Sequence, residues 1–171
     1  MYYTYHETPI GKILIAGNES VIKMMSFPQG DKLRRVEAHW SESKSPFKSA
    51  MSQMDEYFLG DRIHFDLRLA PAGTEFQQSV WKALLSIPYG QTTSYGELAK
   101  TINRPKASRA VGAANGANPI PIIIPCHRVI GSTGKLTGFG GGIPTKQWLL
   151  VHEKKYRPAD KSSEPQSSFR F

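Results

Sequence analysis

The sequence predicts an α+β fold in two parts: a small antiparallel-sheet domain with a helix over residues 1–70, and a mainly helical domain over residues 71–156. Three observations indicate this arrangement. Short β-rich runs separated by turn residues fill the beginning of the chain. Helix-capping signals followed by apolar residues at helical spacing recur from Thr74 onward. Between the two patterns lies Leu69-Ala70-Pro71-Ala72-Gly73, whose composition is typical of a linker.

The first part predicts a small antiparallel meander and one helix. Turn residues at Thr8–Gly11 and at Gly17-Asn18 separate three β-rich runs, which are residues 2–5, 12–16 and 21–27. A helix ending before Gly60 is expected next, because large apolar residues recur there at helical spacing: Phe47, Met51, Met54 and Phe58. The run Ile63–Leu67 then alternates like a strand. We see no catalytic pattern in this part, and its histidines lack metal-ligand spacing: His6, His39 and His64.

The second part opens with three predicted helices. Thr74 and Gln77 form a capping box for the first, and Pro88-Tyr89-Gly90 ends it. Ser94 and Glu97 form a second box for a short helix that ends before Pro105. A third helix begins near Lys106 and has a slim apolar stripe made of Ala107, Ala110, Val111 and Ala114. Two short helices joined by a tight turn predict a helix-turn-helix that presents Arg109 outward.

Basic charge is concentrated in this second part. The chain has 22 Lys and Arg residues against 14 Asp and Glu residues, a formal net charge of +8. No acidic residue occurs between Glu97 and Glu153, whereas basic residues recur through this stretch: Lys100, Arg104, Lys106, Arg109, Arg128, Lys135 and Lys146. A segment with one sign of charge favours binding to the phosphates of a nucleic acid. A solvated basic face that binds nothing is the alternative interpretation.

Cys126 is the only cysteine in the 171 residues. It cannot form an intrachain disulfide, and one thiol alone makes a poor metal site. The preceding run Ile120–Pro125 is rich in β-branched residues and predicts a buried extended segment, so that Cys126 lies where this segment emerges. His127 follows directly and can reach the thiol through a water or a bend. Cys126 is therefore interpreted either as a reactive thiolate or as an inert core residue.

A glycine-rich loop and a closing helix follow the cysteine. The loop Gly131–Gly142 lets backbone groups approach a ligand closely, and its Phe139 can lie against a flat ring. The alternative is a plain hairpin with a core phenylalanine. The closing helix has Pro144 in its first turn and Glu153 near its end. Residues 157–171 are poor in apolar side chains and are expected to form a flexible tail.

Membrane insertion and export are not indicated. No run reaches the roughly 18 apolar residues that a spanning helix requires. The first residues, Met1–Glu7, lack the basic and apolar regions of a signal peptide. We therefore expect a cytoplasmic protein without a membrane partner.

The segment Asn118–Gly131, which contains Pro125-Cys126-His127-Arg128-Val129, resembles the active-site signature of the O6-alkylguanine-DNA alkyltransferases, which are suicidal DNA-repair proteins. The resemblance extends from about Gly73 to Glu153, with further motifs in the order and spacing of the family: Ser94–Leu98, Ser108–Gly112 and Trp148–Glu153. It implies a ribonuclease-H-like domain over residues 1–70 and a winged-helix-like DNA-binding and alkyl-acceptor domain over residues 71–156. The implied activity is that of a single-turnover methylated-DNA–protein-cysteine S-methyltransferase.

The resemblance also implies a mechanism. The protein would bind duplex DNA in the minor groove, flip O6-alkylguanine or O4-alkylthymine out of the helix, and transfer the alkyl group irreversibly to Cys126. A relay from Glu153 through His127 and a water would generate the thiolate. Tyr95 would protonate the leaving base, and Asn118 would brace the turn between the recognition helix and the active-site segment.

The remaining site residues are likewise carried over from the resemblance. The predicted substrate-binding residues are Arg109, Val129, Ser132, Phe139, Gly140 and Lys146. The predicted DNA-binding residues are Tyr95, Lys106, Ala107, Ser108, Arg109, Ala110, Gly112 and Arg128. Arg109 would fill the space left by the flipped nucleotide, while backbone groups of Cys126, Val129 and Gly140 would read the polar edge of the base. Many relatives have tyrosine at the position of Phe139, so a hydroxyl contact is missing here, although stacking should persist.

The expected partner is double-stranded DNA carrying O6-alkylguanine, bound by a protein that is monomeric in solution, with cooperative binding on DNA left open. No cofactor or metal is expected, because the relatives that bind zinc use cysteines that this chain lacks. Two other functions remain as alternatives. A non-enzymatic sensor of alkylated DNA would not need Cys126, and a Cys-His hydrolase of acyl groups would turn over and would not need the basic helix.

Overall fold

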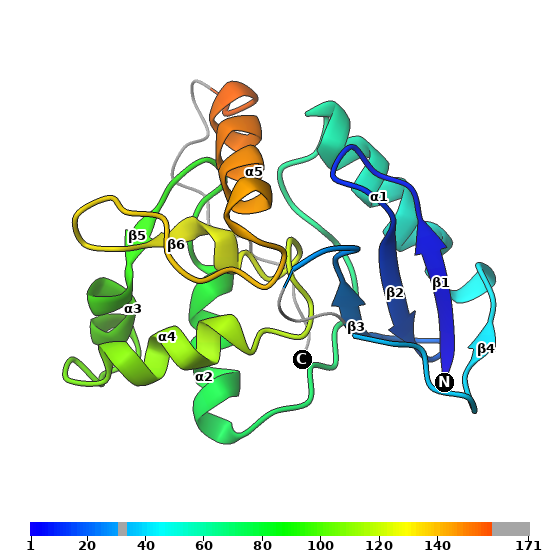
Figure 1. The fold of residues 1–171 in the computed structure, drawn as a ribbon, viewed down its shortest axis with the longest axis horizontal. Helices are drawn as coiled ribbons and strands as arrows, with labels where there is room; N and C mark the ends of the chain where they lie inside the picture. Colours follow the sequence, from blue (N-terminus) through cyan, green and yellow to red (C-terminus); the bar gives the residue numbers. More distant parts are fainter. Residues whose placement is uncertain (31–33, 159–171) are drawn as a thin grey trace.

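The computed structural model describes residues 1–30 and 34–158. Its first part is a four-stranded sheet in the order β3-β2-β1-β4, formed by β1 (Tyr2–His6), β2 (Ile13–Gly17), β3 (Ile22–Ser26) and β4 (Ser41–Glu42). The three predicted strands are antiparallel neighbours, whereas β4, which the sequence did not indicate, is parallel to β1. A 3₁₀ turn, η1 (Ser45–Phe47), leads into α1 (Lys48–Leu59), which lies against the sheet (Figure 1). Gly60 ends α1 with a φ of 87°, as its position predicted.

The strand predicted at Ile63–Leu67 is not formed, and that prediction was wrong. A side chain of α1 takes the hydrogen bonds that a neighbouring strand would have made. The Gln53 amide nitrogen donates to the carbonyl of Asp66 at 3.0 Å, and its amide oxygen accepts from the backbone nitrogen of Asp66 at 2.8 Å. Phe65 is buried against Tyr57, with ring centroids 5.5 Å apart. This stretch therefore runs along α1, and strand-like pairing begins at Leu69, which bridges to Ile22.

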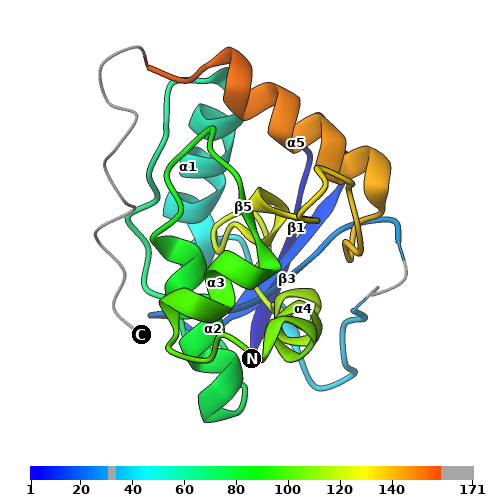
Figure 2. The same ribbon diagram turned by 90° about the vertical axis from the view of Figure 1, so that its left-hand side faces the viewer.

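The second part contains α2 (Glu75–Leu85), α3 (Tyr95–Thr101), α4 (Ser108–Gly116) and α5 (Ile143–Lys155). Both hydrogen bonds of the predicted capping box are present. The Gln77 amide donates to the Thr74 hydroxyl at 3.2 Å, and the Thr74 amide donates to the Gln77 side-chain oxygen at 2.9 Å. At α3 only half of the predicted second capping box forms: the Ser94 hydroxyl accepts from the Glu97 amide at 3.1 Å, but the Glu97 carboxylate pairs with Lys100 instead of the Ser94 amide. α3 and α4 pack together on α2 (Figure 2), where the Trp81 indole donates to a carbonyl of α4. The α+β fold class is thus confirmed.

The segment before the cysteine is buried, as predicted, but it is not extended. The Ile124 amide donates to the Ile120 carbonyl at 2.9 Å, and Ile122 has a φ of 73°. Asn118 closes this turn from both sides, since its amide nitrogen donates to the Ile124 carbonyl at 2.8 Å and its oxygen accepts from the Ile120 amide at 3.0 Å. The two prolines of the run lack the amide hydrogens that a strand needs, so a side-chain-supported turn is formed instead.

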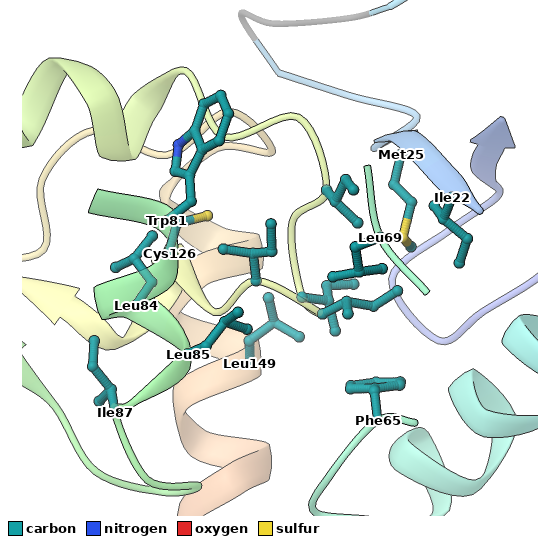
Figure 3. Close-up of a cluster of buried hydrophobic side chains, with 14 of the residues drawn as sticks. Ile22, Met25, Phe65, Leu69, Trp81, Leu84, Leu85, Ile87, Cys126 and Leu149 are labelled. Atoms are coloured by element: carbon teal, nitrogen blue, oxygen red, sulfur yellow. The ribbon is translucent and has the colours of Figure 1, made fainter. Parts of the chain in front are cut away.

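Two further elements place the cysteine. The 3₁₀ turn η2 (Cys126–Arg128) leads into β6 (Val129–Ile130), which pairs in parallel with β5 (Thr93–Ser94) directly before α3. One buried apolar cluster extends across both parts of the molecule (Figure 3). In it Cys126 and Trp81 come from the second part, and Met25 and Ile22 come from the sheet. Side chains of the first part therefore reach the surroundings of the segment that contains Cys126.

Within the described residues, no helix combines the length and the apolar character that crossing a membrane requires. The predicted flexible tail begins at Arg157, and from residue 159 onward it lies outside the described residues.

Candidate active site

Cys126 is the first residue of η2 and is 5% exposed. Its side chain borders a small cavity of about 40 Å³ that both parts of the molecule enclose. Met25 and Phe27 line it from the sheet side, and Asn118 and Phe139 line it from the second part. The thiol is thus nearly buried yet borders internal space.

His127 and Glu153 form a fully buried pair beside the cysteine. The His127 Nε2 and Glu153 Oε1 atoms are 2.7 Å apart, and both side chains are 0% exposed. An ionised carboxylate only accepts hydrogen bonds, so a neutral His127 carries its proton on Nε2. Its Nδ1 atom then bears a lone pair, and no described residue forms a hydrogen bond with it. This tautomer leaves Nδ1 available as a base.

Arg128 is buried at 1% exposure, which corrects the expectation that it contacts DNA. Its guanidinium binds Glu153 in a bidentate way: Nε donates to Oε2 and Nη2 donates to Oε1, each at 2.9 Å. Its Nη1 atom donates to the Ile87 carbonyl at 2.7 Å. The backbone amide of Gly90 donates to Oε2 at 3.1 Å. Arg128 is therefore the permanent counter-charge of Glu153 and does not lie at the surface.

The pKa values of this cluster follow from burial and from its charges. Burial works to raise the pKa of the Glu153 carboxyl, but Arg128 and His127 together hold that pKa well below its ordinary value. Burial lowers the pKa of the His127 imidazole, although Glu153 opposes this shift. Near neutral pH the carboxylate is thus ionised and the imidazole is neutral, which is the state that a general base requires.

These shifts predict that stability falls as the pH falls. Below about pH 6.5 the unfolded chain protonates a histidine that the folded protein keeps neutral. Below about pH 4.3 the unfolded chain also protonates Glu153, which the folded protein keeps ionised. Both folded-state pKa values are lowered, so both groups lose stability in the acidic direction. We expect the free energy of unfolding, measured with urea, to fall by about 1 kcal/mol from pH 7 to 5.5 and faster below pH 4.5. His127→Gln should flatten the first of these two steps, and a stability that rises toward acid would contradict the prediction.

A second cavity, of about 550 Å³, lies between α4 and the loop at residues 137–140. Six of the predicted site residues line it and are thus brought together here: Tyr95, Ser108, Arg109, Gly112, Phe139 and Gly140. Phe139, which is 8% exposed, and Gly140 also border the small cavity at Cys126. The Tyr95 hydroxyl contacts the same loop by accepting from the Thr137 hydroxyl at 3.2 Å. The volume is in the range of small-ligand sites.

The predicted DNA-binding residues of α4 lie at the surface. Four of them are exposed and two are partly exposed: Lys106, Ser108, Arg109 and Ala110, then Ala107 and Gly112. Small side chains along this helix allow a close approach by another molecule, and Arg109 lines the 550 Å³ cavity.

Three of the predicted substrate-binding residues line neither cavity: Val129, Ser132 and Lys146. Lys146 is 0% exposed, and its ammonium donates to the carbonyls of Val129 at 2.7 Å and Thr137 at 2.9 Å. Burial lowers the pKa of Lys146, while its interaction with Cys126 raises it. Lys146 thus supports the loop and adds positive charge near the thiol. Ser132 is exposed in the loop and lines neither cavity, so no contact places it in the site.

Sequence reasoning missed the contribution of the first part to this site. The Tyr57 hydroxyl of α1 donates to Glu153 Oε1 at 2.9 Å. Phe27 packs on Phe139 with ring centroids 5.2 Å apart. A signal for Tyr57 was present, because it lies three residues after Met54 on the apolar face of its helix. A signal for the burial of Arg128 was its place within an otherwise apolar run.

No group of three or more His, Cys, Asp or Glu side chains that could hold a metal ion occurs in residues 1–30 and 34–158.

Comparisons with known proteins agree along the chain. Residues 1–71 match the family model of the 6-O-methylguanine DNA methyltransferase ribonuclease-like domain, and residues 75–155 match that of the corresponding DNA-binding domain. The methylated-DNA–protein-cysteine methyltransferase of Methanosarcina acetivorans is 55% identical over 153 residues, covering 90% of this chain and 98% of that protein. The protein of the same name from Mycobacterium tuberculosis is 49% identical over 160 residues, covering 94% and 96%.

Solved structures give the same result. The crystal structure of Mycobacterium tuberculosis OGT in complex with DNA superposes with a TM-score of 0.86 at 49% identity, covering 94% of this chain and 97% of that one. The O6-methylguanine DNA methyltransferase of Methanococcus jannaschii superposes with a TM-score of 0.67 at 25% identity, covering 94% and 99%.

Proposed function

The chain belongs to the 6-O-methylguanine DNA methyltransferase family, and we propose that it repairs DNA by transferring the alkyl group of O6-alkylguanine irreversibly to Cys126. The observation that carries this proposal is the buried His127–Glu153 pair, whose histidine directly follows the only cysteine. The proposal includes O4-alkylthymine as a further substrate. It divides the chain into a ribonuclease-H-like domain of residues 1–70 and a DNA-binding and alkyl-acceptor domain of residues 71–156.

Activation of the thiol begins at Glu153. Its carboxylate holds the Nε2 proton of His127, so Nδ1 can take the Cys126 proton through a bridging water. The resulting imidazolium is stabilised by Glu153, and the thiolate by the nearby Lys146 ammonium. An ordinary thiol, with a pKa of about 8.5, would be mostly protonated at neutral pH.

DNA binding is assigned to the exposed face of α4. Lys106, which is exposed just before α4, meets a phosphate, and the small residues of this helix suit the minor groove. The lesion base leaves the stack and enters the 550 Å³ cavity, where Phe139 stacks on it and the backbone of Gly140 reads its edge. Val129 does not line this cavity, and its backbone groups bond to Cys126 and Lys146 instead. Arg109 takes the place of the base within the duplex.

The transfer step is a displacement at the alkyl carbon. The thiolate forms an S–C bond as the bond from this carbon to O6 breaks, and the electron pair leaves with the guanine. Tyr95 lies in the base cavity and supplies or orients the proton that neutralises the departing ring. The product, S-alkylcysteine, is a thioether without a carbonyl for water to attack. The protein therefore acts once.

The test is a measurement of stoichiometry by intact mass. The protein is incubated with a fivefold excess of duplex carrying one O6-methylguanine, and its mass and peptide map are recorded. We expect every molecule to gain one methylene equivalent, confined to the peptide that contains Cys126. The same duplex with unmodified guanine is the control and should leave the mass unchanged.

Other outcomes of this experiment contradict the proposal. Unmodified protein that still binds the lesion duplex would favour the lesion sensor. Repaired duplex in excess of one equivalent per protein would mean that the cysteine is regenerated, which favours a hydrolase.

A further inference from the structure

A tyrosine of the first domain contacts the carboxylate of the proposed relay. We propose that Tyr57 is a positioning residue for alkyl transfer, whose hydroxyl holds Glu153 in the orientation that keeps His127 in its basic tautomer. This inference rests on the proposed function and adds to it a role for the sheet domain beyond stability.

The carboxylate oxygen that binds the imidazole is also the oxygen that binds Tyr57. Glu153 Oε1 accepts from the Tyr57 hydroxyl at 2.9 Å and from Arg128 Nη2 at 2.9 Å, and lies 2.7 Å from His127 Nε2. The second oxygen, Oε2, accepts from Arg128 Nε and from the Gly90 amide. Tyr57 thus completes the set of donors that fixes both the rotation and the charge of this carboxylate.

The hydroxyl is aimed at Glu153 by packing on several sides of the ring. Tyr57 is 0% exposed, and its ring contacts Phe58, Phe65, Tyr89 and His152, with centroids 5.3 to 6.0 Å apart. The His152 imidazole also bonds the Tyr57 carbonyl at 2.8 Å. Burial, followed by the charge of Glu153, raises the pKa of Tyr57 well above its ordinary value, so the phenol remains a donor throughout the working pH range.

This contact crosses between the two domains. Tyr57 lies in α1, and Glu153 lies in α5, the helix next to it at one end of the molecule (Figure 2). The two residues are 96 positions apart in the sequence. A displacement of α1 relative to α5 would withdraw the hydroxyl from Oε1, so the reactivity of Cys126 depends on how the first domain is seated.

Loss of the Tyr57 hydroxyl is expected to shift the pKa of His127 upward. With one donor fewer, Oε1 bears more unshared negative charge, which raises the pKa of His127. Proton acceptance requires neutral His127, so the acid side of the rate profile moves to higher pH. The other groups that face the pair stay in place, and they are Arg128 of η2, Lys146 of α5, Cys126, Tyr89 and His152.

The experiment compares Tyr57→Phe with Tyr89→Phe. Tyr89 is a matched control, because its hydroxyl is also buried near Glu153 and Arg128, yet no described residue forms a hydrogen bond with it. For Tyr57→Phe we expect methyl transfer at pH 7.5 to slow by about three- to tenfold, as for loss of one hydrogen bond. We also expect the midpoint of the acid limb of the rate profile to move to higher pH by about half a pH unit. Tyr89→Phe should keep the rate within about twofold.

A second readout separates this inference from the proposed function. The alkylation of Cys126 by iodoacetamide, measured against pH without DNA, reports thiolate formation alone. If the unmodified protein transfers no methyl group but Tyr57→Phe still shifts the iodoacetamide profile, the proposed function fails and the positioning role stands. p-Aminophenylalanine at position 57 retains a donor and should restore most of the rate.

Two results would overturn the positioning role. In the first, the Tyr57→Phe variant matches the Tyr89→Phe variant in transfer rate and in both pH profiles. In the second, p-aminophenylalanine at position 57 leaves the methyl-transfer rate as low as phenylalanine does. Should Tyr57→Phe fail to fold, p-methylphenylalanine fills the space of the hydroxyl without donating and replaces it in the comparison.

Discussion

Replacing Cys126 by serine is expected to lower the rate of methyl transfer by at least about a thousandfold while lesion binding persists. The serine hydroxyl occupies nearly the same space in a residue that is 5% exposed, so the fold should be retained. Its oxygen, however, is not ionised near neutral pH, and the His127–Glu153 pair has no thiol proton to accept. Single-turnover transfer from a labelled O6-methylguanine duplex measures the rate, and gel shift with the same duplex measures binding.

The control tests whether the location of the thiol is decisive. Ser79 is exposed on α2, away from both cavities, so a Cys126→Ser, Ser79→Cys variant restores one thiol at the surface. This double variant should react with iodoacetamide yet fail to accept methyl from DNA. Transfer to the surface thiol, or residual transfer in Cys126→Ser above about one per cent of the unmodified rate, would contradict the assigned nucleophile.

Elements whose signals lie within one turn were predicted correctly. The capping box at Thr74 and Gln77 needs only residues three apart, and it defines the start of α2. The strand expected at Ile63–Leu67 failed because its hydrogen bonds go to Gln53, a side chain thirteen residues before Asp66. The prediction of an extended segment before Cys126 was wrong for the same reason, because the Asn118 side chain makes hydrogen bonds to the backbone and closes a turn there. Alternation of apolar residues cannot report such a competing side chain.

The site was predictable only where the residue type is rare or the family pattern is specific. Cys126 stood out as the only cysteine, and the roles of Glu153 and Tyr95 came from the resemblance and remain predictions. Tyr57 gave no chemical signal, because its partner lies 96 positions away and only the packing of the two domains joins them. Arg128 was counted as a surface charge because charge patterning does not distinguish a buried guanidinium from an exposed one.

Arg128→Met is expected to lower the free energy of unfolding by about 3–5 kcal/mol. Methionine fills much of the space but leaves the Glu153 carboxylate, which is 0% exposed, without its permanent counter-charge. A loss of this size is a large share of the roughly 5–15 kcal/mol that stabilises a typical domain. Urea denaturation at 25 °C and pH 7.5 measures it.

Arg62→Met is the matched control, because Arg62 pairs with Glu56 at 2.7 Å but both side chains are partly exposed, at 27% and 41%. Its cost should stay at or below about 1 kcal/mol, since solvent replaces an exposed ion pair cheaply. The sign of the pH dependence gives a second check. Without Arg128 the pKa of Glu153 rises, so the deficit of Arg128→Met should shrink when the urea titration is repeated at pH 4.5. A deficit equal to that of Arg62→Met, or one that grows in acid, would mean that Arg128 does not stabilise the ionised carboxylate on which the relay depends.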